Sequence, residues 1–428
     1  MGVHAVSGAT CAAVEGTRRP AGSRRALAAP STAPGFPIRS TLVVPPRRRR
    51  QQYGQQAAGQ RLAATSAVHA PVQSMFQVAS AASSVPPFAL AAVALAVIAV
   101  AIKTVLDRPS RAYEDGSTVA REYDAWTDEG VLEHYWGEHI HLGHYSAEER
   151  SKGAGTLLGN FVKDFKQAKF DFVDEMMKWS GATDPKRVLD CGCGIGGTTR
   201  HLAKKFPGAE LTGITLSPSQ VRRATELAAE RGISNTEFKV MNALAMDFPD
   251  NTFDLVWACE SGEHMPDKRA YVKEMVRVLK PGGTLAIATW CQREETASTP
   301  FSEEEKEQLK FLYEEWAHPY FISKEEYGRI AADEGMDNVV AEDWVDTTLP
   351  SWRHSIWVGV WSPWAVIFRG PRIWYKTVRE IVTLERMHRA FARGLMEYGM
   401  IKSVKKATTA TTATAASASD AAPEATVP

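Results

Sequence analysis

The segment Val188–Arg200, VLDCGCGIGGTTR, holds the residues whose types and spacing most clearly indicate ligand chemistry. Four glycines fall at positions 192, 194, 196 and 197, and Asp190 stands just before them. Glycine permits tight turns and lets a ligand approach the backbone and a helix N-terminus closely. The segment therefore predicts a loop that binds a small molecule through its backbone.

Two classes of ligand use such a loop. A dinucleotide requires G-x-G-x-x-G and an acidic residue at the end of the second strand, but that strand ends GITLS and has no acid. S-adenosylmethionine (SAM) fits the alternate spacing from Asp190 through Gly192 and Gly194 to Gly196. Backbone donors suit its carboxylate, and a nearby carboxylate suits its ammonium group. The loop alone is a weak signal, but together with GITLSPSQ, FPDNTFDLVW and VLKPGG at successive strand ends it favours SAM.

Strands and helices that must position this loop alternate along the middle of the chain. The predicted strands are residues 187–192, 210–217, 236–243, 253–259 and 284–290, and the predicted helices are residues 198–206, 219–232 and 267–283. Such alternation predicts βαβ units and a parallel sheet covered on both faces. The expected fold class is α/β with a Rossmann-like, doubly wound sheet, and ligands then lie at the carboxyl ends of the strands.

The chain of 428 residues has no formal net charge, which gives no general argument for nucleic acid or an acidic partner. Its N-terminal quarter is nevertheless basic. Between Glu15 and Asp107 there is no Asp or Glu, whereas arginine recurs up to the run Arg47–Arg50 and Ser and Ala are abundant. This composition is typical of an organellar transit peptide, so we expect a transit peptide and a disordered linker in residues 1–80. A disordered basic arm is the alternative.

Residues 86–106 contain an apolar run, Phe88–Ile102, followed by Lys103 and a short apolar extension. The run is at the lower limit of the roughly 17 to 25 residues that cross a bilayer. We expect a membrane anchor here, with a second targeting element as the alternative. The low-complexity segment 407–428 is expected to be a disordered tail.

The cysteines and histidines of the chain do not have the spacing of a metal site. The number of cysteines is odd, which predicts no disulfide framework, and Cys191-x-Cys193 has the wrong spacing for a zinc knuckle. His139, His141 and His144 have no carboxylate or cysteine partner at a suitable spacing. We therefore expect no metal.

The body of the sequence resembles a known enzyme family. LDCGCGIGGTTRHLAKKF, TGITLSPSQVRRATELA, FPDNTFDLVWACESGEHMPDK and TWCQRE are similar to the γ-tocopherol methyltransferases of plants and cyanobacteria, which transfer a methyl group from SAM to a chromanol ring. Upstream, EYDAWTDEGVLEHYWGEHIHLGHY resembles the cyanobacterial-type 2-methyl-6-phytyl-benzoquinol methyltransferases of the same pathway more closely. Sterol methyltransferases share the glycine loop, but their Tyr-Glu-x-Gly-Trp-Gly stretch is missing here.

The resemblance implies a class I SAM-dependent methyltransferase with an N-terminal lid and a C-terminal substrate-cap insertion. The SAM-binding core with its lid is expected at 113–294, and a substrate-binding, membrane-facing region at 295–406. The implied enzyme is a chloroplast C-methyltransferase at the envelope or thylakoid membrane. The ESGEHMPDK and TWC loops, nearest the methyl group in the resembling enzymes, favour γ-tocopherol and δ-tocopherol as acceptors over the benzoquinol. A non-catalytic, SAM-binding membrane regulator is the alternative from another class.

The resemblance also implies the cofactor site. The expected cofactor-binding residues are Asp190, Gly192, Cys193, Gly194, Gly196, Thr215, Leu216, Asn242, Ala243, Glu260, Tyr135 and His141. Tyr135 and His141 belong to the segment that folds over SAM as a lid in the resembling enzymes, and aromatic faces suit a sulfonium cation. Asn242 stands where an acid usually contacts the adenine amino group, and its amide oxygen can still accept that hydrogen bond. This departure is the only support for the regulator.

Methylation of a ring carbon beside a phenolic hydroxyl requires an aligned methyl donor and a base. The free phenol has a pKa of about 10, so little phenolate forms without help. Glu263 and His264, in the loop after the fourth strand, are the candidate catalytic bases. His264 as a helix cap or a residue that orients the loop is the alternative.

The region 295–406 is rich in tryptophan interleaved with arginine. Its tryptophans include Trp352, Trp357, Trp361, Trp364 and Trp374. This composition suits an interface between lipid and water, and also a pocket for a prenyl tail. The alternative for individual tryptophans is that they fill the core of the cap. Acidic residues such as Glu380 and Glu385 interrupt any basic stripe, so we expect no nucleic-acid partner.

Overall fold

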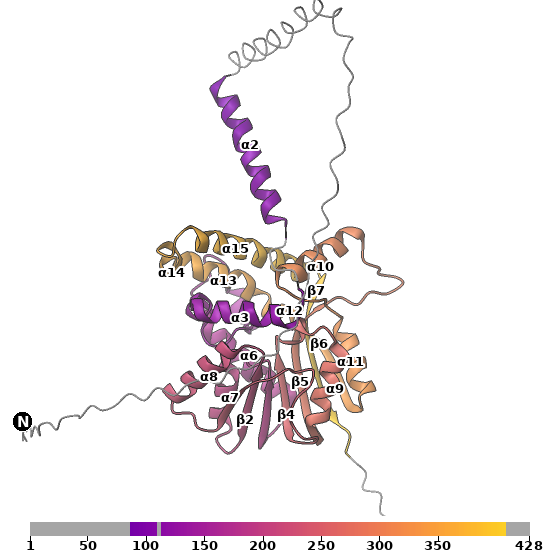
Figure 1. The fold of residues 1–428 in the computed structure, drawn as a ribbon. Helices are drawn as coiled ribbons and strands as arrows, with labels where there is room; N and C mark the ends of the chain where they lie inside the picture. Colours follow the sequence, from indigo (N-terminus) through magenta and orange to yellow (C-terminus); the bar gives the residue numbers. More distant parts are fainter. Residues whose placement is uncertain (1–85, 109–112, 408–428) are drawn as a thin grey trace, which may run out of the picture. The chain divides into compact units, whose positions relative to one another are not determined.

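The computed structural model describes residues 86–108 and 113–407. These residues include a seven-stranded sheet with helices on both faces (Figure 1). The transit segment predicted in residues 1–80 lies outside the described residues. So does the tail predicted at 407–428, apart from Ala407.

The sheet has the strand order β3-β2-β1-β4-β5-β7-β6. Its strands are β1 (Arg187–Cys191), β2 (Glu210–Thr215), β3 (Thr236–Val240), β4 (Phe253–Cys259), β5 (Leu279–Gln292), β6 (Met336–Asp343) and β7 (Met396–Lys405). The first five pair in parallel, whereas β7 is antiparallel to both β5 and β6. A strand is present at each of the five predicted positions, and the α/β fold class is confirmed.

The sheet is mixed, which corrects the prediction of a parallel sheet. β6 and β7 come from the region 295–406, which we expected to bind substrate. β7 pairs with β5 from Thr284 opposite Val404 to Gln292 opposite Met396. The sequence MEYGMIKSVK follows a long helix and not a strand–helix repeat, so the alternating pattern did not point to it. The sheet therefore extends across the domain boundary predicted at residue 294.

Three predicted helices flank the sheet. They are α7 (Gly197–Lys205), α8 (Pro218–Glu230) and α9 (Lys268–Val278). α8 and α9 begin after Ser217 and Asp267, whose side chains accept a hydrogen bond from the backbone N–H three residues later. α9 ends at Val278, earlier than predicted, because Leu279 already pairs with Phe253 of β4.

Each face of the sheet has its own core, because consecutive residues of a strand point to opposite sides. Val188 of β1 packs in a core with α6 (Phe165–Ser180) and α7. Its neighbour Leu189 packs in a second core with α9 and α11 (Lys324–Asp333). This arrangement confirms the doubly wound, Rossmann-like sheet.

A further set of helices packs together beside the sheet. It consists of α3 (Gly116–Glu129), α4 (Val131–Trp136), α13 (Pro350–Trp361), α14 (Trp364–Ile367) and α15 (Pro371–Ala392). Figure 1 shows α3, α13 and α15 stacked above the strands. Trp352 of α13 and Leu384 of α15 belong to the same core as α6, so these helices are packed onto the sheet. Further helices are α5 (Ala147–Ser151), α10 (Glu303–Glu315), α12 (Val345–Thr348) and the 3₁₀ helix η1 (Gly262–His264).

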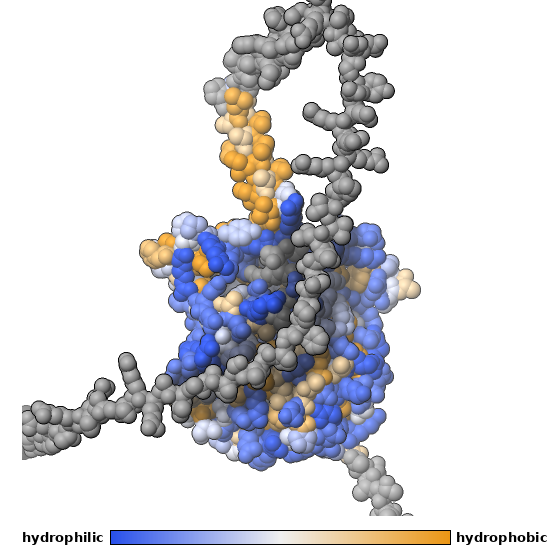
Figure 2. Space-filling model, in the orientation of Figure 1, coloured by the Kyte–Doolittle hydropathy of each residue, from blue (hydrophilic) through white to orange (hydrophobic). Residues whose placement is uncertain are grey.

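The predicted anchor is a helix, α2 (Pro87–Leu106). Its segment Phe88–Leu106 has a mean hydropathy of 2.5 and is long and apolar enough to cross a membrane. Its side chains are exposed, and the space-filling view shows an apolar surface along the helix (Figure 2). Length and composition alone do not separate an anchor from a targeting segment, so the anchor stays a prediction.

Candidate active site

A cleft lies at the carboxyl ends of β1, β2 and β4, where the fold class predicts a ligand site. Most of the expected cofactor-binding residues line it, namely Asp190, Gly192, Cys193, Gly194, Thr215, Leu216, Ala243, Glu260 and His141. Gly196, Asn242 and Tyr135 do not line this cleft. The structure therefore brings together nine residues that are dispersed over the sequence.

The glycines of the loop have different roles, because one is required by packing and another leaves space in the cleft. Gly192 has a φ of 93°, and a Cβ atom there would lie 2.3 Å from Cβ of Ser261. Gly194 has a φ of 53°, and the nearest atom to its Cβ would be Nε2 of Gln220 at 3.9 Å. Gly192 is therefore fixed by packing, whereas Gly194 leaves open space in the cleft. That open space is what a ligand held against the backbone requires.

Gly196 has a structural role outside the cleft. It is the N-cap of α7 with a φ of 77°, and a Cβ there would lie 2.6 Å from the ring of Phe238. Asn242 is exposed, and its Oδ1 accepts a hydrogen bond of 2.9 Å from the backbone N–H of Leu244. An adenine contact by Asn242 stays a prediction.

Asp190 is the acid of the glycine motif. It is 2% exposed, and the Thr199 hydroxyl donates a hydrogen bond of 2.6 Å to its Oδ2. Burial raises the pKa of Asp190 to about 6, although Thr199 counteracts part of that rise. A carboxyl group at this position suits the ammonium group of SAM, whose positive charge would favour the ionised form.

Part of the predicted lid lines the cleft, namely Glu138, His139, Ile140 and His141. Oε2 of Glu138 accepts a hydrogen bond of 2.6 Å from the buried Arg200, which also donates to the carbonyl of Ile195 in the glycine loop. The backbone N–H of Leu142 donates to Oε1 of Glu260 at 2.7 Å. These contacts attach the lid to two separate loops of the cleft.

His139 and His141 of the lid lie against one another, with Nδ1 of His139 and Nε2 of His141 3.2 Å apart. Burial lowers the pKa of His141 to about 3 and keeps the ring neutral at physiological pH. Within residues 86–108 and 113–407, no group of His, Cys, Asp and Glu is arranged to hold a metal ion.

A second cavity, of about 400 Å³, lies beside the cleft. Its walls are mainly apolar and come from α3, α4, α13, α14 and α15, together with Trp290 of β5 and Trp316 after α10. The apolar residues from the helices include Trp126, Leu132, Trp136, Trp352, Ile356, Val366 and Ile381. Tyr135 lines this cavity, and its hydroxyl donates to the carbonyl of Ser362 at 2.7 Å. Among the predicted tryptophans, Trp352 is 1% exposed and packs in the core, while Trp361, Trp364 and Trp374 are exposed.

The cleft and the cavity meet at four residues, because Tyr123, Ile140, Glu260 and His264 line both. Three of these side chains can exchange protons or hydrogen bonds. A ligand in the cleft and a second ligand in the cavity would contact one another across them. This junction is where a group can pass from one ligand to the other.

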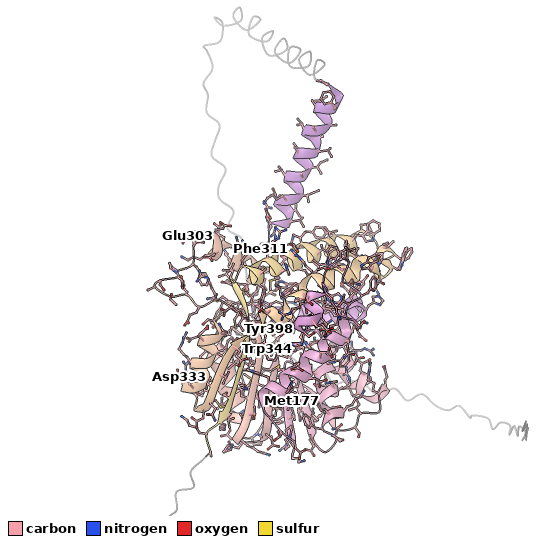
Figure 3. All side chains as sticks on the ribbon, turned by 180° about the vertical axis from the view of Figure 1, so that it is seen from behind. Met177, Glu303, Phe311, Asp333, Trp344 and Tyr398 are labelled. Atoms are coloured by element: carbon pink, nitrogen blue, oxygen red, sulfur yellow. The ribbon has the colours of Figure 1, made fainter. Side chains whose placement is uncertain are left out.

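Glu260 is held rigidly at the junction. It lies just after β4 with a φ of 49°, an unusual backbone conformation for a residue with a side chain. The Tyr398 hydroxyl donates to Oε1 of Glu260 at 2.7 Å. Tyr398 comes from β7 and lies beside Trp344 in the back view (Figure 3). The backbone N–H of Trp344 donates to the Tyr398 carbonyl at 3.0 Å. Burial, followed by the charge of Glu263, raises the pKa of Glu260 to about 8.

Both predicted catalytic residues belong to η1, next to Glu260. Glu263 is 2% exposed and lines the cavity, and its Oε1 accepts a hydrogen bond from the backbone N–H of Trp290. Burial raises the pKa of Glu263 to about 7. Lys268 donates to the carbonyls of Gly262 and Glu263 at 2.7 and 3.0 Å and thereby holds the turn.

His264 lies 2.9 Å through Nε2 from the hydroxyl of Tyr123. Burial, followed by the charge of Lys268, lowers the pKa of His264 to about 3. Neither Tyr123 nor Tyr398 was among the predicted site residues. The EYDAW segment that contains Tyr123 carried part of the resemblance, whereas nothing in the sequence pattern pointed to Tyr398.

Comparisons with known proteins identify the family of the chain. A family model described as a methyltransferase domain matches residues 188–283. The chain is 43% identical over 302 residues to the 2-methyl-6-phytyl-1,4-hydroquinone methyltransferase of Synechocystis sp., covering 69% of this chain and 90% of that protein. It is 34% identical over 287 residues to the chloroplastic tocopherol O-methyltransferase of Arabidopsis thaliana, covering 64% of this chain and 79% of that protein.

Solved structures show the same fold. A geranyl diphosphate methyltransferase in complex with GPP and sinefungin has a TM-score of 0.52 at 20% identity, covering 68% of this chain and 99% of that chain. The geranyl diphosphate C-methyltransferase of Streptomyces coelicolor has a TM-score of 0.51 at 19% identity, covering 69% of this chain and all of that chain. The predicted fold class, SAM-dependent methyltransferase activity and tocopherol methyltransferase resemblance are thus confirmed. The chain belongs to the family of SAM-dependent methyltransferases that contains the tocopherol and 2-methyl-6-phytyl-1,4-hydroquinone methyltransferases.

Proposed function

We propose that this protein methylates the aromatic ring of a phytylated phenol of tocopherol biosynthesis, in the plastid and at a membrane. The observation that carries the proposal is the junction at Tyr123, Ile140, Glu260 and His264, which line both the cleft and the cavity. SAM, when bound in the cleft, supplies the methyl group. The chain itself must then orient the ring and remove a proton.

The cavity suits both the tail and the ring of a prenylated acceptor. Its apolar walls can bury a long hydrocarbon tail, at about 0.8 kcal/mol per buried methylene group. Glu260, Glu263 and His264 gather at the end that adjoins the cleft. The phenolic ring therefore takes the junction end, and the tail extends between α13 and α15.

A carboxylate is the better candidate for the base. A base works best when its pKa approaches that of the group it deprotonates, and the phenol has a pKa of about 10. Burial raises the pKa of Glu263 to about 7 and that of Glu260 to about 8, whereas the pKa of His264 is lowered to about 3. The pKa values alone do not choose between the two carboxyl groups, but Oε1 of Glu260 is already held by Leu142 and Tyr398, whereas Oε2 of Glu263 is buried without a hydrogen-bond partner. We therefore assign Glu263 as the base and give His264, through Tyr123, the task of orienting the acceptor hydroxyl.

Two acceptors fit this chemistry. γ-Tocopherol, together with δ-tocopherol, is favoured by the ESGEHMPDK and TWC loops, which contribute Glu260, Glu263 and Trp290 to the wall of the cavity. The hydroquinone is favoured by the 43% identity to the Synechocystis sp. enzyme, compared with 34% to the Arabidopsis thaliana enzyme. The chloroplastic relative supports the plastid, and α2 supports the membrane.

The deciding experiment incubates the full chain in detergent with methyl-labelled SAM and each acceptor separately. Ring-methylated and O-methylated products have the same mass, so they are separated by chromatography against authentic standards. Label in α-tocopherol assigns the chromanol, and label only in the dimethyl-phytyl hydroquinone assigns the hydroquinone. Bound SAM without any labelled product would overturn the proposal and favour the regulator. Glu263→Gln and His264→Ala are the matched variants. Glu263 lines the cavity and not the cleft, so Glu263→Gln is expected to bind SAM normally.

A further inference from the structure

An exposed apolar surface surrounds the outer side of the cavity. It comprises Leu158, Phe161, Trp361, Trp364, Phe368 and Trp374, and we call it the apolar rim. Leu158 is 91% exposed, Phe368 81% and Phe161 76%. Large apolar side chains exposed to this degree and gathered in one place mark a contact site.

Two segments far apart in the sequence form the rim. Phe161, from the loop after α5, lies against Trp361 at the end of α13, with ring centroids 5.5 Å apart. Trp364 of α14 stacks on Phe368 at 6.3 Å, and Nε1 of Trp374 donates to the Ile367 carbonyl at 3.0 Å. Figure 2 shows apolar atoms gathered at the end of the molecule where α14 lies.

The rim and the cavity are two sides of the same helical layer. Val360, Pro363, Val366 and Ile373 line the cavity from within. Trp361, Trp364 and Trp374 lie next to them in the same helices and are about half exposed or more, at 52%, 64% and 48%. A tail in the cavity is thus separated from the rim only by α13, α14 and the start of α15.

Charge around the rim favours a lipid surface as the occupant. From Thr347 to Arg379 the sequence contains no Asp or Glu. Arg353, Lys376 and Arg379 pair with Glu385, Glu129 and Glu315, so the positive charge that the rim can offer to a lipid surface comes from Arg369 and Arg372. The loop from Lys152 to Lys163 has no acid either. Tryptophan and arginine together suit the boundary between headgroups and acyl chains, particularly where the lipids are anionic.

The end of α2 lies at α15, which also carries Trp374. Asp107, which follows α2, pairs with Arg386 of α15 at 2.5 Å, and Arg379 donates to the Val105 carbonyl at 3.2 Å. A helix apolar enough to enter a bilayer is therefore attached to the helical layer that carries the rim.

We propose that the apolar rim is a bilayer-docking surface, through which a prenylated acceptor passes from the lipid directly into the cavity. The proposal rests on the proposed function, because it presumes an acceptor dissolved in lipid. A second copy of the chain or another protein on the rim is an outcome of the test that would overturn it. The rim acts in addition to α2, which would hold the protein at the membrane without orienting the cavity.

The test places a fluorescent label on the rim. The cysteines among the described residues, Cys191, Cys193, Cys259 and Cys291, are buried, so the full chain with Cys11→Ser accepts a label selectively at an added cysteine. Leu158→Cys and Phe368→Cys label the rim. Glu210→Cys, at the amino end of β2 with a side chain 82% exposed, is the control.

Vesicles of phosphatidylcholine and phosphatidylglycerol are expected to shift the emission of the two rim labels to the blue and protect them from iodide. The control label should not change. Rim labels that stay accessible to iodide on protein that sediments with the vesicles would overturn the proposal. Protection that appears without vesicles and increases with protein concentration would also overturn it, because it would show a contact between copies.

Activity provides a second measurement. Leu158→Glu with Phe368→Glu is expected to lower the methylation rate of a vesicle-borne phytylated acceptor at least tenfold. The rate with a tailless hydroquinone in buffer should stay unchanged. Val240→Glu, another exposed apolar position at 53%, should alter neither rate. Equal losses on both acceptors would contradict docking, whereas a native chain that methylates neither would refute the proposed function and leave the labelling result standing.

Discussion

The hydroxyl of Tyr123 lies 2.9 Å from Nε2 of His264, and the two rings meet edge to face with centroids 5.4 Å apart. Burial, followed by the charges of Glu263 and Glu260, raises the pKa of Tyr123 well above its usual range. The hydroxyl therefore keeps its proton and donates a hydrogen bond to the neutral imidazole. This hydrogen bond joins α3 to the loop after β4 at the junction of the cleft and the cavity.

Tyr123→Phe should lower kcat by about ten- to hundredfold, the cost of misplacing a reacting group by a fraction of an ångström. The ring would still fill its place, so the melting temperature should change little. SAM affinity should also change little, because the lost hydrogen bond is to His264 and not to the backbone of the glycine loop. Steady-state kinetics with the acceptor, alongside calorimetric SAM binding, would check this. An unchanged kcat would show that the hydrogen bond from Tyr123 does not position His264 for the reaction.

The rate should depend on pH through the carboxyl groups at the junction. A base must be ionised, and burial raises the pKa of Glu263 to about 7 and that of Glu260 to about 8. The value of kcat/KM should therefore rise as pH increases through this range, and it should be low at more acidic pH. The two groups interact, so the profile reports the pair and not either residue alone.

The variant Glu263→Gln tests in which direction this pH profile moves. The charge of Glu263 raises the pKa of Glu260, so its removal should let Glu260 ionise at a lower pH. The residual activity of the variant should then rise at a more acidic pH than that of the native chain. A profile that keeps its position, or that falls with increasing pH, would contradict a carboxylate base.

Gly192 and Gly194 should respond differently to alanine. Gly192→Ala would place Cβ 2.3 Å from Cβ of Ser261 and should destabilise the fold by about 3 kcal/mol. Gly194→Ala meets no close atom, so strain at its φ of 53° should cost only about 1 kcal/mol. The same methyl group enters the cleft and should weaken SAM binding at least tenfold. Thermal unfolding and calorimetry on both variants separate the effect on stability from the effect on SAM binding. Equal SAM affinity for Gly194→Ala and the native chain would show that SAM does not contact the loop at Gly194.

Much of the fold and the cofactor cleft could be predicted because their determinants are local. The strand that ends in Asp190, the glycines and the helix after them form one continuous pattern. The second cavity was harder to predict, because Tyr123 and Trp352, which both line it, come from segments more than 200 residues apart. Tyr398 was missed for the same reason, since its contact with Glu260 requires β7 to run antiparallel beside β5.

Glu138 should control how firmly the lid closes over the cleft. Its carboxylate accepts hydrogen bonds from Arg200 and Arg231, and Arg200 is 2% exposed. Arg200 keeps its bonds to the carbonyls of Ile195 and Ala224, so the glycine loop should stay in place when Glu138 is changed. Removing one partner of a buried pair leaves the other charge uncompensated, and Glu138→Ala should therefore cost about 3 kcal/mol of stability.

Glu138→Gln retains the shape and the hydrogen-bond acceptor but loses the charge, so its stability should lie between those of the native chain and Glu138→Ala. In both variants SAM should dissociate faster, because the lid is attached to the cleft partly through this residue. Stopped-flow measurement of SAM release would check the order of the three proteins. The matched control is Glu133→Gln, which removes a carboxylate from Arg223 outside the lid. If Glu138→Gln released SAM no faster than this control, the lid would be held by Leu142 and Glu260 instead.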